Sequence, residues 1–200
     1  MTATGSQTDA ELARKARAGD DRAYAQLVSR HKDGLHRLLR RYLGDADEAR
    51  EATHEAFIAA WGALARYDPD RPFGGWLRTI AINKARDRGR RRAFRRLVFG
   101  DRPPEDTAAR HHPDPSATPD EALMRQERLL LLDRAIAGLP DALKAPLLLT
   151  AIEGRSQQEA AAILGVSVKA VETRVYRARR ALAETLQTEP DPITLPGDRP

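Results

Sequence analysis

The chain has 200 residues, carries a net charge of +5 and contains no cysteine. The length allows one large or two small domains, and the lack of cysteine excludes disulfides, thiol catalysis and cysteine-ligated zinc. The positive charge favours a polyanionic partner. No apolar run is long enough to span a bilayer and no apolar signal segment opens the chain, so we expect a cytoplasmic protein without membrane insertion. Alanine, leucine and arginine dominate and β-branched runs are scarce, which predicts an all-α fold.

The first part of the chain predicts a compact helical domain over residues 9–96, preceded by a disordered tail over residues 1–8. Apolar residues recur at helical spacing from Asp9 to a break at Gly19. A longer periodic run follows and ends at Gly44, a residue typical of helix C-termini.

A third helix is expected over residues 45–67, with a stripe of alanines on one side. Glu48, Glu51 and Glu55 form an acidic stripe, although like charges at this spacing mildly destabilise an isolated helix. The stripe is typical of a solvated face, and the alternative is a docking edge for a basic protein surface.

Residues 72–96 combine an aromatic entrance with a strongly basic helix. Phe73 and Trp76 flank a glycine pair, and Trp76, Asn83 and Arg90 follow one another at seven-residue spacing along one side of the helix. Arginines suit phosphates, and aromatic rings can stack on unpaired bases, so the segment favours nucleic acid. A solvated basic face with its aromatics in the core would give the same pattern. The basic residues of this segment are Arg78, Lys84, Arg86, Arg88, Arg90, Arg91, Arg92, Arg95 and Arg96.

Residues 97–119 are rich in proline and charge and predict a flexible linker. Its adjacent His111 and His112 lack acidic or cysteine neighbours, so we expect no metal site there. A second helical domain is expected over residues 120–187, followed by a disordered tail over residues 188–200. Pro146 lies inside an apolar stretch of this domain and predicts a kink or a late helix start.

The sharpest local pattern is a helix-turn-helix between residues 155 and 182. Ser156 and Glu159 have the spacing of a capping box, Gly165 suits the end of that short helix, and Ser167 caps the next one. The second helix has a buried valine stripe and a basic outward face, which favours DNA binding. An ordinary helical hairpin is the alternative. The outward residues are Lys169, Thr173, Arg174, Arg177 and Arg180.

These motifs together resemble a known family. The segments GDDRAYAQLVSRH, EAREATHEAFIAAW and PFGGWLRTIAINKARDRGRRR resemble region 2 of bacterial sigma factors, in order and spacing. The segment EGRSQQEAAAILGVSVKAVETRVYRARRAL resembles region 4. The chain is therefore similar to an extracytoplasmic-function (group 4) sigma factor of the sigma-70 family of bacterial RNA polymerase.

The resemblance implies three partners: core RNA polymerase, promoter DNA and an anti-sigma factor. The third helix would bind the clamp helices of core polymerase, and region 4 would rest on the flap. Phe73 and Asn83 would shape a pocket for a base flipped from the −10 element, while the second helix of the helix-turn-helix would contact the −35 element. The resemblance implies no enzyme activity, and we find no catalytic residues, cofactor or metal site.

The implied contacts fall into three sets. Those for core polymerase are Glu48, Glu51, His54, Glu55, Phe57 and Trp61. Those for the −10 strand are Phe73, Trp76, Asn83, Lys84, Arg86, Arg88, Arg90 and Arg91. Those for the −35 duplex are Ser167, Lys169, Ala170, Glu172, Thr173, Arg174, Arg177 and Arg179.

The chain departs from the family pattern at a few positions. Arg50, Ala52 and His54 replace an acid, a larger aliphatic and a glutamine that are usual in the third helix. Glu172 stands where a basic residue is frequent, and there it could accept a hydrogen bond from a cytosine amino group or repel phosphate. Two other hypotheses remain open from sequence: a stand-alone helix-turn-helix regulator, and a helical adaptor or enzyme with an incidental basic surface.

Overall fold

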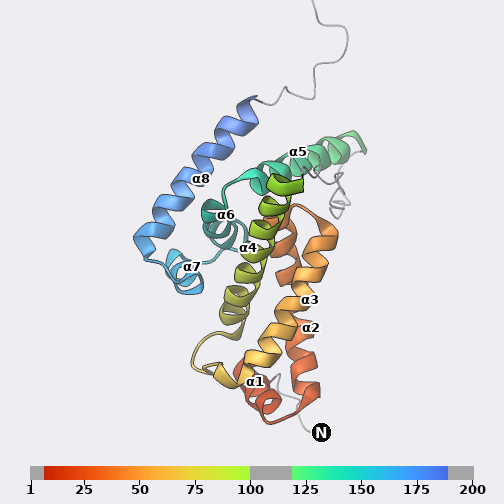
Figure 1. Cartoon of the computed structure of the whole chain (residues 1–200), viewed down its shortest axis with the longest axis vertical. Helices are drawn as coiled ribbons and strands as arrows, with labels where there is room; N and C mark the ends of the chain where they lie inside the picture. Colours follow the sequence, from red (N-terminus) through yellow and green to blue (C-terminus); the bar gives the residue numbers. More distant parts are fainter. Residues whose placement is uncertain (1–6, 100–118, 189–200) are drawn as a thin grey trace, which may run out of the picture.

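The computed structural model describes residues 7–99 and 119–188, and within these ranges every regular element is helical (Figure 1). This confirms the all-α prediction. The first half contains α1 (Asp9–Arg17), α2 (Asp21–Leu43), α3 (Ala46–Ala63), the short η1 (Leu64–Arg66) and α4 (Phe73–Phe99). The second half contains α5 (Pro119–Gly138), α6 (Asp141–Leu147), η2 (Leu148–Ile152), α7 (Gln157–Leu164) and α8 (Val168–Thr188). Most of the expected linker, at residues 100–118, and of the expected tails, at residues 1–6 and 189–200, lies outside the described residues, as do His111 and His112.

Local capping signals set the helix boundaries of the first half. Thr8 and Glu11 form a capping box at the start of α1, and Asp20 accepts hydrogen bonds from two backbone N–H groups at the start of α2. Gly44 ends α2 with a φ of 74°, a conformation that glycine adopts without strain. The predicted breaks at Gly19 and Gly44 are therefore confirmed.

The alanine stripe of α3 lies in the core of the first half. Ala49, Ala52, Ala56 and Ala60 are fully buried, and α3 packs against both α2 and α4. Small side chains at these positions allow the helix backbones to approach closely, and burying their apolar surface stabilises the bundle. The bundle thereby fixes α4 at the centre of the molecule (Figure 1).

The second half contains the predicted helix-turn-helix. The Ser156–Glu159 capping box opens α7, and Gly165 ends it with a φ of 65°. The Ser167 hydroxyl accepts a hydrogen bond from the Ala170 N–H, as expected of a cap for α8. These local predictions are confirmed.

Pro146 lies inside α6, and the helix does not continue regularly after it. Because proline has no N–H, the carbonyl of Ala142 lacks its normal helical donor. A π-turn follows at η2, in which the Thr150 hydroxyl donates to the Pro146 carbonyl at 2.8 Å. The predicted disturbance near Pro146 is confirmed as this widened turn, whereas α6 itself begins before the proline.

The two halves pack against each other, which the sequence did not predict. Helix α4 contacts α3 and α2 on one side and α7 on the other, and α2 contacts α5 (Figure 1). Arg78 of α4 forms a two-point ion pair with Glu153, with N–O distances of 2.6 and 2.9 Å, and these side chains are only 11% and 14% exposed. Arg41 pairs with Asp133 at 3.2 Å. The halves therefore form one closed arrangement with charged groups at its seam.

Candidate nucleic-acid and polymerase-binding surfaces

The start of α4 is an aromatic cluster buried in the first half. The ring of Phe73 lies 5.4 Å from the rings of His31 and Tyr67 and 5.5 Å from that of Trp76, and Phe73 is only 1% exposed. The aromatic contacts orient the rings and contribute to packing. No face of Phe73 is therefore available for a base to stack on in this conformation. The contact that Phe73 does make is with the ring of Trp76, which it supports from the core.

A pocket of about 390 Å³ lies between α4 and α7. Trp76, which is half-buried, and Asn83, which is exposed, line it from α4. Ile163 and Gly165 line it from α7, and the Thr79 hydroxyl donates to the Ile163 carbonyl at 2.9 Å. The structure thus places Trp76 and Asn83 in one pocket, whereas Phe73, the expected partner of Asn83, lies outside its lining. It also places the helix-turn-helix across from them.

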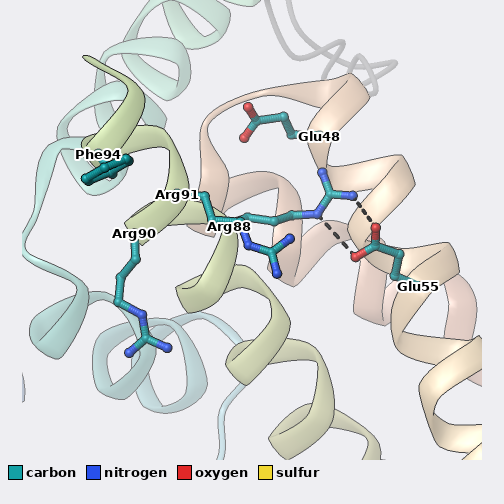
Figure 2. Close-up of a pocket in the computed structure, with 6 residues that line it drawn as sticks. All are labelled: Glu48, Glu55, Arg88, Arg90, Arg91 and Phe94. Carbon is teal, nitrogen blue, oxygen red and sulfur yellow. Dashed lines mark hydrogen bonds and ion pairs between the residues drawn. The ribbon is translucent and has the colours of Figure 1, made fainter. Parts of the chain in front are cut away.

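The basic residues of α4 do not form one uniform face. Arg88 turns toward α3 and Glu55, whereas Arg90 points away from it (Figure 2). Arg90 pairs with Asp87 on its own helix. Lys84 and Arg86 are half-buried, and Arg91 is exposed. The side chains of Arg92, Arg95 and Arg96 lie outside the described residues.

Glu51 and Glu55, two members of the acidic stripe on α3, form ion pairs with Arg88. The Arg88 guanidinium donates to Glu55 at 2.7 Å and to Glu51 at 3.1 Å. The hydrogen bond from Arg88, and its positive charge, hold the pKa of Glu55 below its usual value, although partial burial opposes this shift. The stripe is therefore not simply a solvated face, because an arginine from the neighbouring helix pairs with two of its three carboxylates.

The outer face of α3 carries an exposed apolar pair beside His54. Ile58 is 59% exposed and Trp61 is 40% exposed, whereas Phe57 is buried at 7%. Phe57, which was expected among the contacts, packs into the bundle, and Ile58 is the neighbouring apolar side chain that this face exposes. Periodicity alone does not decide which of two adjacent apolar residues points inward.

Most of the predicted −35 residues lie on the solvent face of α8. Lys169, Glu172, Thr173, Arg177 and Arg179 are exposed, as is the capping residue Ser167, and Ala170 and Arg174 are half-buried. Lys169 pairs with Glu172 at 2.8 Å, so the unusual acid has a basic neighbour on its own helix. Tyr176, which is 69% exposed on the same helix, was not among the predicted contacts, because a single tyrosine in a basic run is no signal of DNA binding by itself.

Within the described parts of the chain, no cluster of histidine and acidic side chains could hold a metal ion. None of the helices described there is long and apolar enough to cross a membrane.

The fold and these surfaces define a class: a two-domain helical DNA-binding protein with a helix-turn-helix in one half and a basic, aromatic-edged helix in the other. Comparison with known families sharpens this. Residues 27–95 match Sigma-70 region 2, and residues 129–182 match Sigma-70, region 4. The chain belongs to the sigma-70 family and is an extracytoplasmic-function (ECF) sigma factor.

Similar curated proteins cover nearly the whole chain. The RNA polymerase sigma factor CnrH of Cupriavidus metallidurans is 37% identical over 90% of this chain and 95% of its own. The ECF RNA polymerase sigma-E factor of Escherichia coli is 30% identical over 90% of this chain and 95% of its own.

Solved structures agree with this. The structure of CnrH in complex with the cytosolic domain of CnrY is similar with a TM-score of 0.67 and 35% identity, covering 92% of this chain and all of that one. The sigma factor RpoE in complex with the anti-sigma factor NepR from Bartonella quintana has the same fold, with a TM-score of 0.66 and 22% identity over 84% of this chain and 98% of that one.

The chain therefore directs RNA polymerase to promoters, as a sigma factor does. A stand-alone helix-turn-helix regulator is not favoured, because residues 27–95 belong to a separate sigma region that such a regulator would not need. The family consists of non-enzymatic transcription initiation factors.

Proposed function

We propose that the two surfaces on α3 and α4 divide the work of region 2 between core polymerase and the −10 strand. Trp76 and Asn83 carry this proposal, because they share one pocket at the edge of a basic helix. A base extruded from the duplex would stack on Trp76, contributing roughly 1–3 kcal/mol, and Asn83 would hydrogen-bond its edge. Phe73 would support Trp76 from the core.

Phosphates of the same strand would lie along the basic residues of α4. Because phosphate contacts are independent of sequence, they add affinity that falls with salt. The residues assigned to this role are Lys84, Arg86, Arg88, Arg90 and Arg91.

Core polymerase would dock on the outer face of α3. His54, Ile58 and Trp61 offer an apolar centre, and exposed apolar area of this kind is typical of a binding surface. Glu48, Glu51 and Glu55 would border it and meet basic groups on the clamp helices. The flap would receive region 4.

The −35 element would be read in the major groove by the exposed face of α8. Glu172 would accept from a cytosine amino group while Lys169 offsets its repulsion of phosphate. The remaining contacts assigned to this face are Ser167, Ala170, Thr173, Arg174, Arg177 and Arg179.

Promoter binding in this arrangement requires the halves to separate, because a strand reaching Trp76 and Asn83 would have to pass between α4 and α7. A protein inhibitor that holds the halves together would keep the factor inactive. CnrH was solved with the cytosolic domain of CnrY, and RpoE with the anti-sigma factor NepR. By analogy we expect an anti-sigma partner here, a cytoplasmic location and no enzyme activity of its own.

Run-off transcription with core polymerase and a promoter from the source genome tests the proposal. Wild-type protein should give promoter-specific transcripts. Trp76→Ala and Asn83→Ala should each lower open-complex formation about tenfold or more, because each removes a contact to the extruded base. Binding of these variants to core polymerase should be unchanged. No transcript from any promoter with wild-type protein, or full melting by both variants, would refute the assignment.

A further inference from the structure

Arg88 joins the two surfaces assigned to different partners. It belongs to the basic helix α4, yet its side chain crosses to α3 and is only 21% exposed (Figure 2). Its Nη1 donates to Glu51 Oε2 at 3.1 Å, its Nη2 to Glu55 Oε1 at 2.7 Å and its Nε to Glu55 Oε2 at 3.4 Å. One guanidinium therefore satisfies two carboxylates that are 37 and 33 positions away in the chain.

This geometry is incompatible with a simultaneous phosphate contact of full strength. An arginine binds phosphate through the same planar set of N–H groups that it presents to a carboxylate. The Nε and both terminal nitrogens of Arg88 are already directed at Glu51 and Glu55. In the free protein Arg88 is thus held out of the phosphate-binding set.

The ion pairs of Arg88 with Glu51 and Glu55 can be exchanged for other partners. Glu51 is 66% exposed and Glu55 is 45% exposed, and ion pairs with exposed partners contribute little because water and salt screen them. A cavity of about 600 Å³ lies beside the pair, between Glu48, Glu55, Arg88, Arg90, Arg91 and Phe94. A released guanidinium has room to turn into it (Figure 2).

We infer that Glu51 and Glu55 are positioning residues for Arg88, which hold it against α3 in the free protein and release it to a DNA phosphate when a basic partner surface takes the carboxylates. Lys84 and Arg91 also lie close enough for their charges to act on Glu55, and Arg90 is paired with Asp87. The exchange concerns Arg88 in particular because Arg88 donates hydrogen bonds to both Glu51 and Glu55. The inference rests on the proposed assignment of α3 to polymerase and α4 to DNA. The inference links the two surfaces, because docking of polymerase on α3 would add one phosphate contact to the DNA-binding helix α4.

The test is a double-mutant cycle in the free full-length protein, with a labelled oligothymidylate as probe. Glu51→Gln/Glu55→Gln should bind the probe more tightly, by about fivefold near 0.1 M salt, and should steepen the salt dependence by about one phosphate contact. The gain should vanish in an Arg88→Gln background, because the released cation is then absent.

The cycle separates release of Arg88 from a simple loss of negative charge. If the gain persists in the Arg88→Gln background, the carboxylates act through the general field and the inference is overturned. Asp47→Asn is the control on the same helix, since the ion pair of Asp47 is with Arg50, whereas those of Arg88 are with Glu51 and Glu55. It should leave the probe affinity within twofold.

A second arm uses the holoenzyme at saturating core polymerase. There the wild-type protein should already have released Arg88, so Glu51→Gln/Glu55→Gln should give no further gain in affinity for the same probe. An equal gain in free protein and holoenzyme would contradict the exchange. Because the first arm needs no polymerase, its failure is distinguishable from a failure of the transcription assay.

Discussion

Tyr42 is a buried ionisable residue whose pKa leads to a prediction about stability at high pH. It lies in the core where α2 meets the second half, and it is 1% exposed. The Lys144 ammonium lies 5.5 Å from its ring centroid. Burial first, and then the nearby charge of Asp141, raise the pKa of Tyr42 to about 12.

Replacing Tyr42 with phenylalanine should reduce the loss of stability at high pH. In the unfolded chain the phenol ionises near pH 10, but in the folded protein it keeps its proton to about 12. Folding therefore loses stability as pH rises through this window, by about 2 kcal/mol for this residue. Urea unfolding of the wild type and Tyr42→Phe, at pH about 9 and about 11.5, measures the difference.

Tyr176→Phe provides the matched control, since this tyrosine is exposed on α8. It gives the effect of removing a tyrosine hydroxyl from an exposed site, with which the effect of Tyr42→Phe is compared. Equal slopes for Tyr42→Phe and wild type would contradict the burial argument. Tyr24, whose pKa is also raised to about 12 by burial, should account for part of the remaining slope.

At the scale of elements, the helix-turn-helix depends on a capping box at the start of α7. The Ser156 hydroxyl accepts from the Glu159 N–H at 3.1 Å, and the Glu159 carboxylate accepts from the Ser156 N–H at 2.9 Å. The hydrogen bond from the Ser156 N–H holds the pKa of Glu159 below its usual value. A helix of eight residues has few internal hydrogen bonds, so its ends matter more than in a long helix.

Ser156→Ala should destabilise the protein by about 1 kcal/mol, because it leaves the Glu159 N–H of α7 without its side-chain acceptor. Thermal or urea unfolding gives the stability change, and hydrogen exchange should show lower protection in α7. Ser29→Ala is the control, an exposed serine in the interior of α2, and should be neutral or slightly stabilising. A cost no larger than that of the control would mean that packing alone holds α7.

The closed arrangement of the whole molecule depends on the seam between its halves. Arg78 donates to both oxygens of Glu153 and, in addition, to the Gly74 carbonyl at 2.9 Å. Both charged side chains are largely buried, and removing one partner of such a pair leaves an uncompensated charge. Either truncation should therefore favour separation of the halves.

Arg78→Ala or Glu153→Ala should shift the free protein toward an open state, with a larger radius of gyration in solution scattering. Since the chain has no cysteine, dyes can be attached at Ala65→Cys and Ala183→Cys, both exposed, to follow the distance between the halves. In the charge-exchanged variant Arg78→Glu/Glu153→Arg, the ion pair can form again, so the distance between the halves should return in part to that of the wild type. Identical distances in all variants would show that apolar contacts alone close the molecule.

The local structure of this protein, and its family, can be predicted from patterns within short stretches of the chain. The helix start at Ser156 and the helix ends at Gly44 and Gly165 follow from hydrogen bonds between residues a few positions apart. Such signals can be read directly from spacing. The order of the region 2 and region 4 motifs likewise indicated the class of protein before any fold was known.

Tertiary structure alone decided how these elements face one another. Phe57 points into the bundle while Ile58 points out, and the ring of Phe73 is covered from all sides. Arg88 pairs with carboxylates on another helix, and Arg78 pairs with Glu153 in the other half. The two arginine contacts join residues more than thirty positions apart, and neither charge nor periodicity along one helix carries information about its neighbour.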